Sequence, residues 1–364
     1  MQPRPGADAE QAPISGMATP YPASWIDHLI AWIGRLPGPA WVFYVLATIL
    51  LILVSHGVRW LDGSLPRGEF DPARVAEAPL ILYFLALMHS LNSVARRSLD
   101  AFRPALAISE PQVARLEYEL TTMPRAAGYI SAAVGSVVGI LSILSSPASW
   151  GISVGTSPLT LGYTVVASAV SMAFAAAFVF HTLRQLRLVS RIHRMATNIN
   201  LFEKMPVYAF SALTARTGIG IVIIIYYYVY LFYFLHLFGP TYRASLIDSL
   251  TTVVFLLLAA ASFVLPLNGM HHRLGEEKAR LAAEADRRFE AALKRLHERL
   301  DSDSFERMDD LNKALASLVI ERDALARIST WPWRPETLRS FLTSVALPVL
   351  IWVVTAFLGR LLEV

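Results

Sequence analysis

Three histidines in a charged stretch are the first candidates for metal chemistry. His271 and His272 are adjacent, and His297 follows in the same stretch. A metal ion needs side chains that converge on one point, whereas neighbouring residues of a helix point to different faces. We therefore expect no metal site in this stretch.

A histidine and a serine lie together in an apolar stretch, where they suggest an intramembrane base and nucleophile. His89 and Ser90 are neighbours, however, and adjacent side chains on a helix cannot form that dyad. A buried hydrogen-bonded cluster with Asn92 is expected instead. The chain also lacks a phosphate-binding glycine loop ending in Lys-Ser/Thr, an HExxH motif, a Gly-x-Ser-x-Gly elbow and any cysteine. We expect no catalytic residue, no cofactor and no enzymatic activity.

Tyrosines fill another apolar stretch, at 215–238. Tyr226, Tyr230 and Tyr233 share one face at helical spacing. Tyrosine prefers the two edges of a membrane, yet Tyr226 lies near the middle of this stretch, where a hydroxyl needs a partner or a cavity. Two interpretations remain, namely a ligand or water cavity and hydroxyls bonded to neighbouring helices.

The last apolar stretch carries a weakly polar line. Ser340, Ser344, Ile351 and Thr355 fall along one side of a helix. Such a line suits a water-lined pore in which an apolar ring forms the gate. It also suits ordinary contacts between membrane helices, which use serine and threonine as hydrogen-bonding groups.

The composition of the chain indicates that these candidate residues lie on membrane helices. Of the 364 residues, 55% are hydrophobic and 16% are charged, whereas soluble domains carry about a quarter charged residues. The apolar residues form blocks about twenty residues long, the length of a helix that crosses a bilayer. We predict an all-α polytopic protein with seven spans, at 39–57, 76–95, 126–146, 158–182, 215–238, 246–267 and 337–361.

The spans are also poor in ionisable groups. None carries Asp, Glu, Lys or Arg away from its borders. Ion-coupled transporters and pumps usually place such groups at membrane depth, so this absence argues against that class.

The N-terminal residues before the first span form two segments. Residues 1–22 lack the pattern of a cleaved signal and are expected to form a disordered tail. Residues 23–36 form an amphipathic stretch, which predicts either a helix lying on the membrane or a helix packed on the protein itself. This helix and the first six spans make up 23–267.

Small residues recur in the third and fourth spans. Ser131, Gly135 and Gly139 follow at steps of four, and the fourth span contains Ala167, Ser168, Ser171, Ala175 and Ala176. Small side chains at this spacing let two helix backbones approach closely in lipid. We predict close packing of these spans on their neighbours.

The connections between the spans predict the orientation. The connection 181–216 carries Arg184, Arg187, Arg191, Arg194, Lys204 and Arg216 against the single acid Glu203. In contrast, 147–159 has no charge and 239–247 has only Arg243. Because basic residues stay on the cytoplasmic side, we expect a cytoplasmic N-terminus and an external C-terminus in a plasma or inner membrane.

One long polar segment, 268–336, separates the last two spans. Residues 270–300 continue the sixth span as a charged helix, and 304–328 carry a second apolar stripe at helical spacing. We predict an antiparallel cytoplasmic hairpin that packs on the inner ends of other spans or on sister subunits. The final unit, 337–364, then holds the seventh span and the candidate pore helix.

This layout resembles the insect olfactory and gustatory receptor superfamily of seven-helix ligand-gated channels. The resemblance covers the whole chain in outline, with 304–328 matching a cytoplasmic half of the last helix and 337–361 a pore-lining half. Thr330-Trp331-Pro332-Trp333 lies between these halves. The resemblance implies a cytoplasmic anchor domain, a tetramer and a central pore.

The expected function is a homo-oligomeric ion channel or receptor-like channel, gated by a small-molecule ligand and lined by the last helix. A small-molecule transporter is one alternative, and a non-conducting scaffold or sensor that acts through the hairpin is another. The expected partners are the lipid bilayer and further copies of the chain. The sequence contains no basic stripe that alternates with aromatic residues, so we expect no nucleic-acid partner.

Overall fold

The computed structural model describes residues 19–71, 77–145, 152, 155–197, 201, 204–238, 246–302 and 308–362. Within these ranges, the side chains of 77, 204–205, 228–238, 246–255, 348–349 and 351–362 lie outside the description. All regular structure in the described chain is helical, which confirms the all-α fold class.

The helices follow the chain in this order. They are α1 (Trp25–Gly34), α2 (Ala40–Leu61), α4 (Glu77–Phe102), the 3-10 helix η1 (Arg103–Ala105), α5 (Glu110–Thr121), α6 (Arg125–Ser145), α7 (Pro158–Met195), α8 (Lys204–Val207), α9 (Ser211–Phe238), α10 (Leu246–Asp301), α11 (Met308–Arg327) and α12 (Pro335–Leu362).

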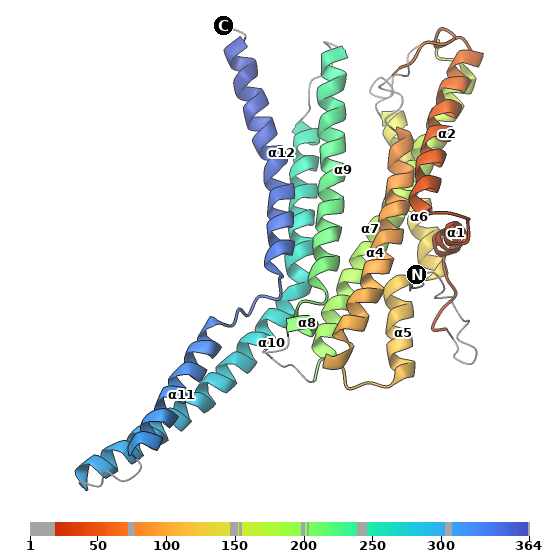
Figure 1. Cartoon of the computed structure of the whole chain (residues 1–364). Helices are drawn as coiled ribbons and strands as arrows, with labels where there is room; N and C mark the ends of the chain where they lie inside the picture. The colour runs from red at the N-terminus through yellow and green to blue at the C-terminus, as the bar shows by residue number, and fades with distance from the viewer. Residues whose placement is uncertain are drawn as a thin grey trace, which may run out of the picture.

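The long helices form two groups that lie beside each other (Figure 1). One group contains α2, α4, α6 and α7, and the other contains α9, α10 and α12. Contacts of α4 and α7 with α9 and α10 join the groups. A shared core of buried apolar side chains runs through both groups, with Leu91 and Phe102 of α4, Val189 of α7, Leu213 of α9 and Met270 of α10 among its members.

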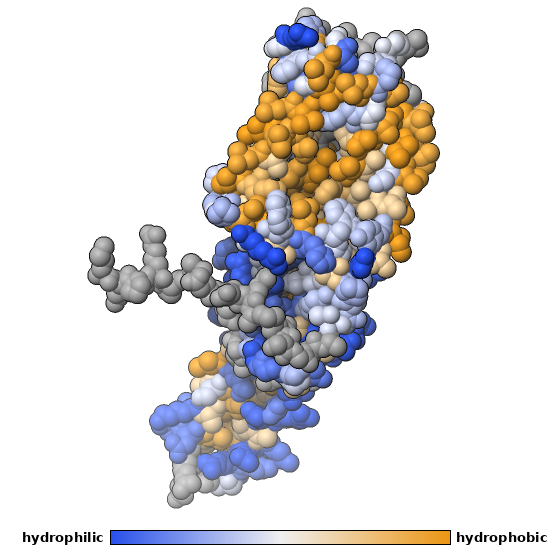
Figure 2. Space-filling view, turned by 90° about the vertical axis from the view of Figure 1, so that its right-hand side faces the viewer, coloured by the Kyte–Doolittle hydropathy of each residue, from blue (hydrophilic) through white to orange (hydrophobic). Residues whose placement is uncertain are grey.

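Four of the described helices, α2, α4, α6 and α7, are long and apolar enough to cross a bilayer. The stretch of α9 whose side chains are described, Ser211–Tyr227, is apolar but shorter. Large apolar side chains remain exposed on the outer faces, including Leu46 at 61% and Ile130 at 64%. Figure 2 shows, on one face of the molecule, a broad apolar surface over the upper body with hydrophilic residues below it. An apolar surface of this extent is unfavourable in water, so the chain is a membrane protein with transmembrane helices.

The pairing of α6 and α7 confirms the predicted close packing of small residues. A Cβ atom added to Gly135 would lie 2.1 Å from the carbonyl oxygen of Met172, and one added to Gly139 would lie 2.6 Å from that of Ser168. The hydroxyl of Ser168 donates to the carbonyl of Gly139 at 3.2 Å. Glycine is therefore required at both positions, since any side chain would meet backbone atoms.

Helix α1 packs on the protein, as the second interpretation of 23–36 predicted. Its N-terminus carries a capping box, in which the Ser24 hydroxyl accepts from the Asp27 backbone and Asp27 accepts from the Ser24 backbone. Ile26 and Ile33 are buried, whereas Trp32 stays half exposed. Burial raises the pKa of the Asp27 carboxyl above its usual value, although its hydrogen bonds oppose this effect.

The segment before α1 is anchored as well. The Tyr21 hydroxyl donates to the carbonyl of Thr122 at 3.0 Å, and the Arg184 guanidinium donates to the same carbonyl at 2.8 Å. Burial raises the pKa of Tyr21 to about 12. Residues 1–18 of the expected tail lie outside the described residues. For the described part the expectation of disorder is wrong, because Tyr21 is bonded to Thr122 and Arg184.

The N-terminal end of α7 is capped by a residue at the end of α2. Asp62 accepts hydrogen bonds from the backbone of Thr160 at 3.1 Å and from the backbone of Ser64 at 2.9 Å. Hydrogen bonds from nearby hydroxyl groups, that of Thr160 first among them, and the bond from the Ser64 backbone hold the pKa of the Asp62 carboxyl well below its usual range. A carboxylate is favourable here because the first backbone N–H groups of a helix have no partner inside the helix.

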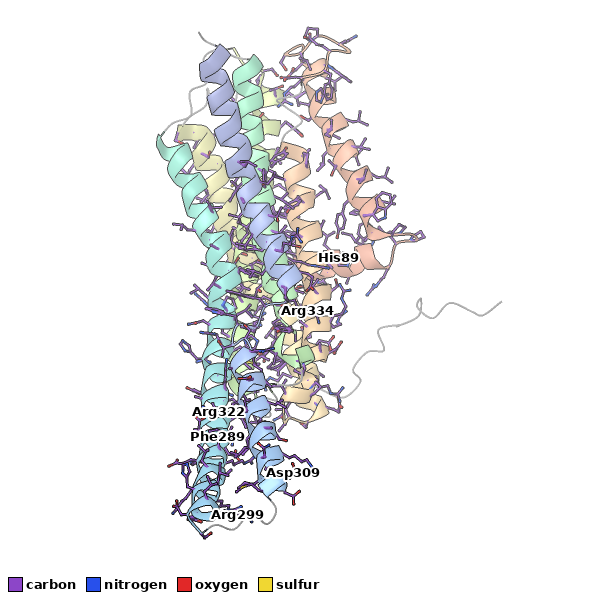
Figure 3. All side chains as sticks on the ribbon, turned by 60° about the vertical axis from the view of Figure 1, so that its left-hand side comes forward. His89, Phe289, Arg299, Asp309, Arg322 and Arg334 are labelled. Atoms are coloured by element: carbon purple, nitrogen blue, oxygen red, sulfur yellow. The ribbon has the colours of Figure 1, made fainter. Side chains whose placement is uncertain are left out.

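Helix α10 is continuous from the apolar stretch into the charged one, with Pro266 inside it. Its far half lies alongside α11, and the two project together from one end of the bundle (Figure 1). Figure 3 shows Phe289 of α10 next to Arg322 of α11. The guanidinium lies 4.9 Å from the ring centroid and also donates to Asp286 at 2.9 Å.

Candidate functional site

Helix α12 is attached to the rest of the described chain along one face. Phe341 is buried against Ala215 of α9 and Phe263 of α10, and Val345 packs beside them. A Cβ atom at Gly218 of α9 would lie 2.6 Å from the Phe341 ring, so α9 and α12 touch closely at this level. The opposite face, by contrast, has large exposed apolar side chains at Leu342, Leu347 and Leu350.

Two residues that the sequence assigned to separate sites meet in the structure. The Tyr226 hydroxyl, a candidate for the ligand cavity, donates to the backbone carbonyl of Ser344, a candidate pore residue, at 2.9 Å. The Ser344 hydroxyl donates in turn to the carbonyl of Phe341 at 2.7 Å. The pair ties the middle of α9 to α12.

The remaining candidates divide into one described side chain and four that are not described. Ser340 is exposed on α12, one turn before Ser344. Tyr230 and Tyr233 belong to the backbone of α9, and Ile351 and Thr355 to that of α12, but their side chains lie outside the described residues. The described part of the chain therefore joins Tyr226 to Ser344 and places Ser340 on the uncovered side.

A column of stacked aromatic rings connects the start of α12 to α10. The Phe341 ring stacks on Phe263 with centroids 4.2 Å apart, and Phe263 stacks on Trp333 at 5.1 Å. Trp333 stacks on Trp331 at 4.4 Å, and Trp331 stacks on His271 at 3.9 Å. The planes of these last pairs differ by only 11°. The connection between α11 and α12 is thus held against α10 by ring faces.

Hydrogen bonds hold the same connection from the hairpin side. The Lys278 ammonium donates to the carbonyls of Ala326 and Ile328, each at 2.8 Å. A cation at this place satisfies carbonyls that have no partner inside α11 and suits the negative end of the helix. The carbonyl of Thr330 lies 3.2 Å from the Nδ1 of His271. The connection that leads into the first turn of α12 is therefore held both by α10 and by the end of α11.

Comparisons with known proteins add no relative. No protein-family model matches the chain, and no curated protein or solved structure matches it. The site is thus interpreted from its own geometry.

The polar residues of α4 contact two different neighbours. The His89 ring nitrogen Nδ1 lies 2.9 Å from the Tyr44 hydroxyl of α2, and Figure 3 shows His89 in the body of α4. The Asn92 side-chain oxygen lies 2.7 Å from Nε2 of His181 on α7. Ser90 is exposed. The prediction of hydrogen bonding is confirmed, but the expected single cluster is wrong because the two side chains face different helices.

The aromatic column is the feature that sequence reasoning missed. The signal was present in Trp331-Pro332-Trp333, because a proline fixes an extended backbone and leaves two large rings one residue apart. His271 was considered only as a metal ligand, yet in the structure it ends the column. Among the described residues, no three His, Cys, Asp or Glu side chains are grouped so that they could hold a metal ion.

Proposed function

We propose that the chain is a homo-oligomeric membrane channel in which α12 lines a central pore. The observation that carries the proposal is the one-sided attachment of α12. The face of α12 that packs on α9 and α10 is fixed by Phe341 and by the hydrogen bond from Tyr226. The remaining face leaves Ser340 and the leucines at 342, 347 and 350 uncovered. Copies of this uncovered face around an axis would form a weakly polar conduit with apolar constrictions, in which Ile351 supplies the gate and Thr355 the outer lining.

The proposed topology has seven crossings. Four are the long apolar helices α2, α4, α6 and α7, and the other three are α9, α10 and α12, which run alongside them (Figure 1). The hairpin projects from one end of the bundle, and the C-terminal end of α12 lies at the opposite end. With basic connections inside, this arrangement gives a cytoplasmic N-terminus and an external C-terminus in the plasma or inner membrane.

The proposed gate is controlled through the aromatic column. Trp331 and Trp333, which lead into α12, stack between His271 and Phe263 of α10, and Phe263 stacks in turn on Phe341 of α12. A displacement of the hairpin would therefore tilt or rotate the first turn of α12. A small ligand near Tyr226 would act on the same helix farther along it, because the Tyr226 hydroxyl donates to the Ser344 carbonyl of α12. The tetramer, and the assignment of the hairpin as an anchor domain, rest on the resemblance to the insect receptor channels.

A second candidate is a non-conducting scaffold or sensor that works through the hairpin. The hairpin leaves Leu300, Val319 and Ile320 exposed at 47%, 44% and 69%, although they lie in an otherwise charged region. Exposed apolar side chains outside the membrane favour contact with another protein. In this reading α12 packs on lipid and conducts nothing.

One experiment separates the two candidates. The purified protein is reconstituted in nanodiscs, viewed along its symmetry axis by electron microscopy and tested for conductance in planar bilayers. The channel requires a ring of subunits with α12 nearest the axis and a measurable current. A monomer, or a ring with α12 on its lipid-facing rim and no current, would favour the scaffold.

A further inference from the structure

The inner end of α7 carries three arginines on one face. Arg187, Arg191 and Arg194 follow at steps of four and three residues, and all three are exposed. Within the described chain none of them takes part in an ion pair or hydrogen bond. Other arginines of the chain, in contrast, are paired with acids, including Arg96, Arg103, Arg115, Arg280, Arg288 and Arg322.

The contacts between α6 and α7 place these arginines relative to the membrane. Gly135 faces Met172, and Gly139 faces Ser168, so four residues forward on α6 correspond to four residues backward on α7. The same register puts Arg125, at the start of α6, level with residue 182 of α7.

Exposed amphipathic aromatic residues mark the inner edge of the bilayer at about this level. Trp32 is 50% exposed on α1, Trp41 is 66% exposed near the start of α2, and Tyr129 is 53% exposed near the start of α6. The Arg125 guanidinium lies 5.9 Å from the Tyr129 ring centroid. Tryptophan and tyrosine gather where the hydrocarbon meets the headgroups, so the edge crosses α7 near residue 182.

The exposed face of α7 changes from apolar to basic at that edge. Phe180 and Leu183 are each 38% exposed, and Arg187 and Arg191 follow them on the same side. With 1.5 Å per residue, Arg187 lies about 8 Å and Arg191 about 14 Å below the edge, next to a headgroup layer about 5–7 Å thick. Arginine can extend its charged end toward that layer along its aliphatic stem.

We propose that this face binds one acidic phospholipid of the inner leaflet. An acyl chain lies along Phe180 and Leu183, and the phosphate is held by Arg187 and Arg191, whose guanidinium groups match phosphate oxygens. Arg194, farther from the edge, strengthens the attraction through its field alone. A soluble polyanion would use the arginines but not the apolar side chains above them. This site does not depend on the pore or on the number of subunits.

The test compares matched variants in lipid mixtures. Wild type, Arg187→Gln/Arg191→Gln, Arg187→Lys/Arg191→Lys and the hairpin control Arg280→Gln/Arg288→Gln are purified from nanodiscs with equal amounts of phosphatidylglycerol and phosphatidylcholine of identical chains. Retained lipid is counted by native mass spectrometry, and the affinity for short-chain phosphatidylglycerol is measured by thermal shift. Each basic residue near an anionic surface strengthens binding by about fivefold, so the Gln pair should lose about twenty-five-fold. The hairpin control should stay within a few-fold of wild type. The Lys pair keeps the charge but loses the guanidinium geometry, so it should fall between wild type and the Gln pair. Arg194→Gln should lose less than Arg187→Gln.

Two outcomes overturn the proposal. One is an unchanged preference for phosphatidylglycerol in the Gln pair. The other is inorganic phosphate that displaces the lipid at comparable concentration, because the acyl chain would then contribute nothing. The melting temperature in phosphatidylcholine alone separates loss of the site from misfolding, and the single variant Arg187→Gln replaces the pair where the pair melts early.

Discussion

The contact between α6 and α7 gives the sharpest prediction about stability. Replacing Gly135 by alanine puts a Cβ atom 2.1 Å from the Met172 carbonyl oxygen and 2.9 Å from Cα of Ala173. Both are backbone atoms, so no side-chain rotation can relieve the clash. An ordinary contact begins at 3.4 Å, and the helices would therefore have to move apart by about 1.3 Å.

The cost of that separation follows from what it disrupts. Overpacking of this kind costs about 1–3 kcal/mol. Two hydrogen bonds cross the same contact, from Ser168 to the Gly139 carbonyl at 3.2 Å and from Ser136 to the Ala169 carbonyl at 3.3 Å. Each is worth about 0.6 kcal/mol in a membrane protein. Gly135→Ala should thus lower the free energy of unfolding by about 2–4 kcal/mol.

The assay is reversible unfolding in mixed detergent and dodecyl sulfate, followed by loss of tertiary signal. Gly162→Ala is the matched control, because Gly162 lies in α7, the helix that packs against Gly135 of α6, and a Cβ atom at Gly162 has nothing within 4 Å. Alanine is the better helix former by up to about 1 kcal/mol at both positions, so the difference between the variants isolates the steric cost. Equal stability of the two variants would refute the close contact of α6 and α7.

Three further predictions concern other parts of the chain. Asp62→Ala should destabilise the protein at neutral pH because Thr160 loses its partner. The pKa of Asp62 is lower in the folded protein than in the unfolded chain. The difference in melting temperature between wild type and the variant should therefore be present above about pH 4 and shrink as the pH falls further. A difference that does not change with pH would contradict this explanation. A reporter fused after Val364 should lie on the external side, and one inserted near Ser302 should lie in the cytoplasm. If both reporters give cytoplasmic signals, the chain has one crossing fewer than proposed. Leu315 on α11 is half-buried, so Leu315→Asp should place an unpaired charge in a partly apolar contact and lower the melting temperature. Size-exclusion and melting profiles equal to those of wild type would count against packing of this face of α11.

Much of the fold could be predicted because membrane helices are specified locally. A block of apolar residues must form a helix in lipid, and small residues at steps of four predict where two such helices touch. The start of α7 at Pro158 agrees with the predicted span, but the helix continues to Met195 because its basic residues extend it beyond the bilayer. Local sequence cannot tell where a helix leaves the membrane when it does not stop there.

The contacts between distant segments could not be predicted. Asp62 caps a helix that begins almost a hundred residues later, and Tyr226 bonds to a carbonyl of Ser344. Both contacts depend on which helices are neighbours, and a hydroxyl or carboxyl has no preference for one carbonyl or N–H group over another. His89 and Asn92 illustrate the same limit, because their spacing predicts hydrogen bonding but not the partners Tyr44 and His181.

The central claim, that α12 lines a pore, is tested most directly by charged thiol reagents. The chain has no cysteine, so each introduced one is the only thiol. Single cysteines are placed at 340 and 355, and controls at 344, 345 and 352, and the current across a bilayer is recorded while the reagent is added. The account predicts that modification at Ser340 and Thr355 reduces the current. It predicts that Ser344, which lies on the attached face of α12, is protected together with Val345 and Trp352. Equal protection of all five positions, or no current from the wild-type protein, would contradict it.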